Sequence, residues 1–133
     1  MQVERLDHIN IITERLDETA DWYARMLDLE RRDAPPPMTP QNAQWMFDAR
    51  GLAIIHINAL DFKRTCDRPV EPGGHTGALH HVALRMQGYD DMKARLDAQG
   101  AQYRENFVEA INLRQIFTTD PNNVLLELNF FGG

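Results

Sequence analysis

Two stretches of the chain resemble each other, and each carries a histidine among apolar residues. The first reads LDHINI and contains His8, and the second, 73 positions later, reads LHHVAL and contains His81. Each has a later partner with one polar side chain in an apolar run: AIIHINAL contains His56, and VLLELN contains Glu127. Four potential metal ligands therefore recur at matching places, which predicts one site built from two halves of the chain.

These four side chains suit a divalent metal ion. Three imidazoles and one carboxylate are ligands that Fe(II), Mn(II), Ni(II), Co(II) or Zn(II) accepts. An open coordination position would admit a substrate oxygen, on which the ion would act as a Lewis acid toward an enolate-like or catecholate-like group. Glu127 is also the best candidate to move a proton. A single histidine of this kind is usually a hydrogen-bonded strand residue, but four in register favour a site.

The residues around the predicted ligands follow from strand geometry, because successive side chains of a strand point to opposite faces. His80 must therefore face away from His81, and it is left out of the site. Arg114 and Gln115 begin one strand, so one of the two must face the site. Uncompensated burial of a polar group costs roughly 2–7 kcal/mol, which favours a polar cavity on this face. The side chains that we expect to contact substrate are Asn10, Asn58, Arg85, Arg114 and Asn129.

The elements that must position these residues repeat along the chain. Apolar alternation predicts strands, and spacings of three and four predict two helices, the first with Asp17 as its N-cap. Because the pattern repeats, each half is interpreted as β-α-β-β-β, with alternation identifying three of the four strands in the first half and all four in the second. Module one is at 1–60, a Gly- and Pro-rich connection at 61–78 and module two at 79–133, in a single domain, 1–133. The predicted strands are 5–13, 44–47, 52–58, 79–86, 103–108, 113–118 and 123–130, the helices 17–29 and 90–99, and the turns 48–51 and 120–123.

Composition narrows the class of partner. The 133 residues carry a net charge of −6, which argues against nucleic acid, because phosphate binding requires a basic face. No apolar run approaches the roughly 18 residues of a membrane span, and the first residues lack a signal-peptide core. Cys66 is the one cysteine, so no internal disulfide can form. We therefore expect a cytoplasmic protein with a small-molecule substrate.

The same motifs resemble those of the vicinal oxygen chelate superfamily, also called the glyoxalase, bleomycin-resistance and dioxygenase superfamily. The resemblance rests on LDHINI, DETADWYARMLDLE, AIIHINAL, LHHVALRM and FTTDPNNVLLELNF, and it covers nearly the whole chain. It implies an α+β fold in which paired βαβββ modules form an incomplete barrel around a divalent metal. The ligands would come from the first and last strands of each module. It also implies a homodimer, with modules paired within one chain or swapped between two.

Departures from this family refine the expected function. His56 stands where the glyoxalase I branch usually has Glu, and Ile12 and Leu60 replace its glutathione-binding Arg and Asn. Lactoylglutathione is therefore not the expected substrate. The leading hypothesis is a metal-dependent, glyoxalase-like lyase or isomerase acting on a small oxygenated substrate. The first alternative is an extradiol-type ring-cleaving dioxygenase with Fe(II) held by His8, His81 and Glu127. The second is a binding protein that sequesters a small molecule, as in drug resistance.

Overall fold

The computed structural model describes residues 1–63 and 75–132. The chain divides into two compact units, Met1–Gly73 and Gly74–Gly133, and each is described by itself. The boundary falls within the stretch 61–78 that the sequence predicts as a connection. Cys66 and most of that connection lie outside the described residues.

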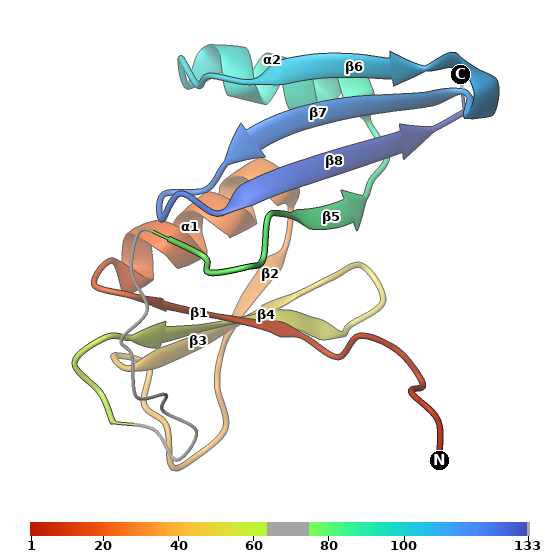
Figure 1. The fold of residues 1–133 in the computed structure, drawn as a ribbon. Helices are drawn as coiled ribbons and strands as arrows, with labels where there is room; N and C mark the ends of the chain where they lie inside the picture. The colour runs from red at the N-terminus through yellow and green to blue at the C-terminus, as the bar shows by residue number, and fades with distance from the viewer. Residues whose placement is uncertain (64–74, 133) are drawn as a thin grey trace. The chain divides into compact units, whose positions relative to one another are not determined.

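The first unit is a four-stranded sheet with one long helix (Figure 1). Its strands are ordered β1-β4-β3-β2, with β1 parallel to β4 and the other neighbours antiparallel. The parallel pair sets the beginning and the end of the module side by side, so residues far apart in sequence become neighbours. The elements are β1 (Ile9–Thr13), α1 (Leu16–Leu27), β2 (Glu30–Asp33), β3 (Ala43–Phe47) and β4 (Ala53–Ala59).

The second unit repeats this arrangement, with strand order β5-β8-β7-β6 and β5 parallel to β8. Each unit is thus a βαβββ module, which confirms the predicted α+β fold with a duplicated module. The elements are β5 (Val82–Arg85), α2 (Tyr89–Ala98), β6 (Arg104–Val108), the short 3-10 helix η1 (Glu109–Ile111), β7 (Leu113–Thr119) and β8 (Leu125–Phe131).

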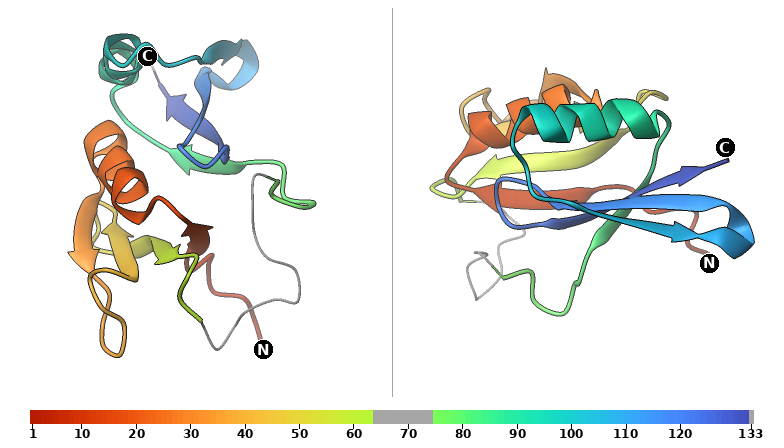
Figure 2. Two further views of the ribbon diagram at one scale, coloured as in Figure 1. Left: turned by 90° about the vertical axis from the view of Figure 1, so that its left-hand side faces the viewer. Right: turned by 90° about the horizontal axis from the view of Figure 1, so that it is seen from above.

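Alternation along the strands separates an apolar face from a polar one in both sheets. Ile55 and Ile57 of β4 are buried, as are Leu126 and Leu128 of β8, as the sequence predicts. In the first unit α1 packs on β2, β3 and β4 through buried side chains that include Tyr23 (Figure 2). His56 of β4 and Glu127 of β8 therefore lie on the strand faces opposite these buried aliphatic residues.

One turn recurs in both modules and supports the duplication. The Oδ1 atom of Asp48 accepts hydrogen bonds from the backbone N–H groups of Arg50 and Leu52, at 2.9 and 3.0 Å. The Oδ1 atom of Asp120 likewise accepts from the second and fourth residues after it, at 2.7 and 2.9 Å. Gly51 and Asn123 take positive φ at the same place in each turn, +80° and +64°. Each turn joins the two strands that end its module.

The first module contains a strand and a helix start that differ from the predictions. β2 reads ERRD and has no apolar alternation, so its sequence does not indicate a strand. The first helix begins at Leu16, so Asp17 lies inside the first turn and is not the N-cap. Its carboxylate instead accepts a hydrogen bond from Arg31 of β2, at 2.5 Å.

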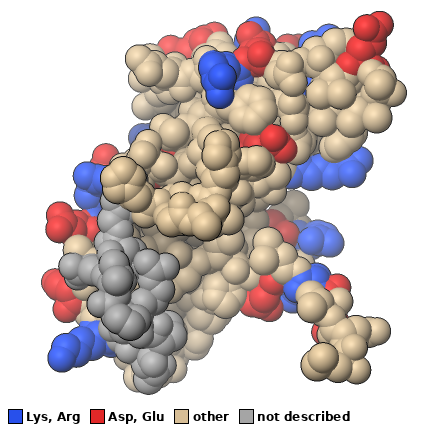
Figure 3. Space-filling view, in the orientation of Figure 1, with Lys and Arg blue, Asp and Glu red and all other residues tan. Residues whose placement is uncertain are grey.

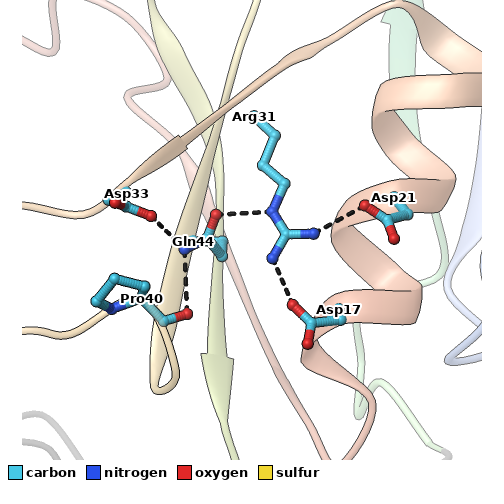
Figure 4. Close-up of polar contacts among 6 residues, drawn as sticks. All are labelled: Asp17, Asp21, Arg31, Asp33, Pro40 and Gln44. Atoms are coloured by element: carbon cyan, nitrogen blue, oxygen red, sulfur yellow. Dashed lines mark hydrogen bonds and ion pairs between the residues drawn. The ribbon is translucent and has the colours of Figure 1, made fainter.

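Arg31 is the centre of a polar network that joins α1 to the sheet (Figure 4). It donates to Asp17 and Asp21 of α1 and, through Nε, to the side-chain oxygen of Gln44 at 2.7 Å. The amide nitrogen of Gln44 then donates to Asp33 and to the carbonyl of Pro40. Burial opposes the charge on Arg31, but the two carboxylates outweigh it and raise its pKa.

None of the helices within residues 1–63 and 75–132 is long and apolar enough to cross a membrane. On the face seen in Figure 3, the acidic and basic side chains of the described residues are interspersed.

Candidate functional site

Three flat side chains stack on the polar face of the first unit. The rings of His8 and His56 are 3.6 Å apart between centroids and 12° from parallel, and those of Trp45 and His56 are 4.0 Å apart and 9° from parallel. Trp45 lies directly opposite His56 in the β3–β4 register. His8 immediately precedes β1, which is parallel to β4. The parallel strand pair thus brings His8 against His56, although 48 residues separate them.

Two observations on this stack bear on which imidazole nitrogens could bind a metal. The Nδ1 atom of His8 lies 2.6 Å from Oδ2 of Asp7, and a carboxylate only accepts, so this nitrogen carries a proton. That hydrogen bond holds the pKa of Asp7 below its ordinary value, and it leaves Nε2 of His8 free for a metal. Burial, followed by the nearby His8, lowers the pKa of His56 to about 4, so His56 is neutral at pH 7.

The second unit brings together the other two predicted ligands. The Nε2 atom of His81, just before β5, lies 3.7 Å from Oε1 of Glu127 on β8. Ligand atoms about 2.1 Å from one ion can be at most about 4.2 Å apart, so this separation allows both to bind the same ion. The Nδ1 atoms of His80 and His81 are 3.0 Å apart, a contact that the sequence did not predict.

Amide side chains surround these ligands. In the first unit Asn58 donates to the side-chain oxygen of Asn10, at 2.5 Å. In the second unit Asn129 donates to Oε2 of Glu127 at 2.9 Å, and Gln115 donates to Asn129 at 3.1 Å. The three asparagines predicted to contact substrate, Asn10, Asn58 and Asn129, therefore each share a polar face with a predicted ligand in their own unit.

The two arginines predicted to contact substrate lie on opposite faces. Arg85 pairs with Asn129 in the β5–β8 register, and its guanidinium lies 4.3 Å from the ring centroid of Phe131. Arg114 pairs with Phe130, and its guanidinium lies 5.2 Å from the ring of Tyr89 on α2.

This placement corrects the face assigned to Arg114. Of the two residues between which the sequence left the choice open, Gln115 shares the face of Glu127. The sequence also missed Asn106 as a neighbour of Gln115 and Trp45 as a neighbour of His56. Cross-strand register would have identified all three, but register is not readable from alternation within one strand.

A hollow of about 570 Å³ lies in the second unit. Its lining includes Arg104, Phe117, Thr119 and Leu125. Phe117 lies directly opposite Glu127 in the β7–β8 register, and Arg104 lies over the ring of Phe117 at 5.7 Å. The lining of the hollow therefore combines a cation with apolar and polar side chains, and it includes the residue opposite Glu127 in the register.

The four predicted ligands are of types that a borderline divalent ion accepts, but one histidine ring would have to move. The lone pair of an imidazole nitrogen lies in the ring plane, so the stacked rings of His8 and His56 direct their lone pairs side by side. Binding of one ion by both requires one ring to rotate out of the stack. Within residues 1–63 and 75–132, no group of three or more His, Cys, Asp or Glu side chains lies close enough together to hold a metal ion.

Comparisons with known proteins agree with this fold. The model of the Glyoxalase/Bleomycin resistance protein/Dioxygenase superfamily matches residues 7–118, a range that includes the three predicted histidine ligands and ends before Glu127. No curated protein matches the chain in sequence.

Several solved structures share the fold at low sequence identity. A glyoxylase/bleomycin resistance protein/dioxygenase domain from Frankia sp. EAN1pec is 17% identical with a TM-score of 0.73, covering 98% of this chain and 94% of that one. A glyoxalase/dioxygenase from Nostoc punctiforme is 13% identical with a TM-score of 0.70, covering 98% and 92%.

A third similar structure carries a metal. It is a variant of the fosfomycin resistance protein FosX from Listeria monocytogenes in complex with Mn(II) and 1S,2S-dihydroxypropylphosphonic acid. It is 22% identical to this chain with a TM-score of 0.68, and the match covers 98% of this chain and 95% of that one. From the match to the family model over residues 7–118 and from the repeated βαβββ module, the chain belongs to the glyoxalase/bleomycin resistance protein/dioxygenase superfamily.

Proposed function

We propose that this chain is a divalent-metal-dependent enzyme that acts on a small oxygenated substrate as a lyase or an isomerase. One observation carries the proposal: each module brings two of the four predicted ligands into contact, His8 with His56 and His81 with Glu127. The Mn(II) complex of the fosfomycin resistance protein supports the use of a divalent metal within the same fold.

The four side chains have different roles in this proposal. His8, His56 and His81 bind the ion through neutral imidazole nitrogens, and Glu127 supplies the one anionic ligand. When bound, the ion acts as a Lewis acid toward a substrate oxygen. Glu127 can also hold a substrate proton when its carboxylate is free. Arg85 and the hollow beside Phe117 would orient an anionic or hydroxylated substrate next to that carboxylate.

Metal analysis of protein purified without chelators tests the proposal. We expect about one divalent ion per chain, as in a mononuclear site. His81→Ala and Glu127→Ala should each remove most of this metal, whereas His75→Ala, at an exposed histidine, should leave it unchanged. Equal metal content in all four proteins would show that the site assignment is wrong. A folded, metal-free wild-type protein would favour the sequestering protein instead.

An Fe(II)-dependent ring-cleaving dioxygenase is the second candidate. His8, His81 and Glu127 form the two-histidine, one-carboxylate set that non-haem Fe(II) oxygenases use. Oxygen uptake by the Fe(II)-loaded protein with a panel of catechols separates the two candidates. Uptake that depends on Glu127 would favour the dioxygenase, and turnover without oxygen would favour the lyase or isomerase.

We also propose that modules 1–60 and 79–133 act as one domain, in a cytoplasmic homodimer. What supports this proposal is that each module holds two of the four predicted ligands, His8 with His56 and His81 with Glu127. Sedimentation analysis at micromolar concentration should give twice the chain mass of 15.3 kDa.

A further inference from the structure

A row of amide side chains crosses the sheet of the second unit and ends on Glu127. Asn106, Gln115 and Asn129 lie directly opposite one another on β6, β7 and β8. Asn106 donates to Gln115 at 2.8 Å, Gln115 donates to Asn129 at 3.1 Å, and Asn129 donates to Oε2 of Glu127 at 2.9 Å. Glu127 lies two residues before Asn129 on the same face of β8, so the last hydrogen bond of the row runs along that strand.

The orientation of the three amide groups follows from the carboxylate of Glu127 at the end of the row. An ionised carboxylate accepts hydrogen bonds and cannot donate, so the amide nitrogen of Asn129 must face Glu127. The oxygen of Asn129 is then left to accept from Gln115, and the oxygen of Gln115 to accept from Asn106. Gln115 is 9% exposed, so its amide groups would be costly to leave unpaired. One carboxylate therefore fixes the orientation of three amides, and they in turn fix the carboxylate.

We propose that Asn106, Gln115 and Asn129 are positioning residues that hold Glu127 ready to bind a divalent metal. The row occupies Oε2 and leaves Oε1, the oxygen that faces His81, as the binding atom. This inference rests on the proposed function, because it assigns Glu127 to a metal. The first unit has only the Asn58–Asn10 pair at the matching place, and its histidines are held by stacking.

A titration with Mn(II) alone, followed by the EPR signal of the free ion, tests the role in metal binding. Gln115→Met keeps the side-chain length and removes the donor to Asn129. We expect its Mn(II) Kd to rise about 10- to 100-fold, the usual effect of removing a partner that orients a ligand. Asn106→Ala, at an exposed position, should cause a smaller rise with no risk to folding.

The matched control is Thr118→Val on the same strand. Thr118 is buried and donates to the carbonyl of Gln102, and it faces away from Glu127. Its Mn(II) Kd should match that of the wild type. If Gln115→Met also binds Mn(II) with the wild-type Kd while Glu127→Ala abolishes binding, the positioning role is overturned and the proposed function survives.

A second readout needs no metal. Gln115→Glu replaces the donor to Asn129 with an acceptor, so the amide of Asn129 must turn to donate to it. Asn129 then presents its oxygen to Glu127, where two acceptors face each other. The urea midpoint of unfolding should therefore fall. Adding Glu127→Gln supplies a donor at the other end, so the double variant should regain the midpoint of Glu127→Gln alone. Measurement in 1 M NaCl screens the repulsion between the two carboxylates, because the Debye length there is about 3 Å.

The two readouts separate the two proposals. If the wild type binds no Mn(II), the proposed function fails and the positioning role toward a metal fails with it. Recovery in the double variant would then still establish the row as the determinant of the Glu127 orientation. Absence of recovery would overturn the row itself.

Discussion

At the level of single residues, the two modules hold their predicted ligands by different interactions. The first stacks the imidazole of His56 between the ring of Trp45 and the imidazole of His8, and the second holds a carboxylate by a hydrogen bond from the amide of Asn129. The difference follows from the chemistry of the ligands. An imidazole ring has two apolar faces that can be stacked, whereas a carboxylate is oriented only by donors to its oxygens.

The ring stack predicts an optical signal of metal binding. If His8 and His56 bind one ion, a ring must leave the stack, and the emission of Trp45 should change. The Trp22→Phe variant isolates Trp45, since the chain has two tryptophans. Zn(II) is the suitable ion because it has no redox chemistry of its own. His56→Ala should abolish the change, and Zn(II) binding with constant emission would contradict the rotation.

At the level of elements, the first module depends on contacts that are not apolar. β2 has a polar sequence, and Arg31 joins it to α1 and to the buried Gln44 of β3. The ion pairs with Asp17 and Asp21 involve carboxylates that are 81% and 66% exposed, so each contributes little. The bond to Gln44, which is 3% exposed, matters more because its acceptor is buried.

The difference in burial between Gln44 and the two carboxylates predicts how much stability two variants should lose. Arg31→Ala leaves the oxygen of Gln44 buried without its donor, and it should lower the free energy of unfolding by about 1–3 kcal/mol. The double variant Asp17→Asn with Asp21→Asn keeps that donor, and it should cost less than about 1 kcal/mol. Urea denaturation measures both. Equal losses would mean that the ion pairs, and not the bond to Gln44, hold α1 to the sheet.

The turn at Asp48 predicts a dependence of stability on pH. Hydrogen bonds from the backbone of Leu52 and then of Arg50 lower the pKa of Asp48 below 3.8. A carboxyl with a lowered folded pKa stabilises the protein above its unfolded pKa, and the contribution is lost as pH falls through the folded pKa. Asp48→Ala should therefore cost about 0.5–1.5 kcal/mol at pH 7. Urea denaturation should show the difference shrinking below about pH 4, and a difference independent of pH would contradict this origin.

At the level of the whole molecule, the proposed site needs ligands from both units. A bound ion stabilises the folded state by RT ln(1 + [L]/Kd), which is about 2.7 kcal/mol at 100 times Kd. Metal should therefore raise the unfolding temperature of the wild type. His8→Ala in the first unit and Glu127→Ala in the second should both abolish this rise. A rise that survives either substitution would place the ion in one unit alone.

The sequence by itself determined the elements that local pattern controls. Apolar alternation predicted the strand around His56 and the one around Glu127, and Asp with Gly or Asn predicted the turns that begin at Asp48 and Asp120. The duplicated motif predicted two βαβββ modules, which the structure confirms. The four predicted ligands remain a proposal, although each has its expected partner within its own module.

Only the tertiary structure decided the contacts between strands. β2 has no alternation to identify it, and Asp17 lies within the helix, where Arg31 reaches it from that strand. The stack on Trp45 and the row from Asn106 through Gln115 depend on which residues of neighbouring strands lie opposite each other. Register is set by the packing of the whole sheet, and a shift of one residue would turn every one of these side chains to the other face.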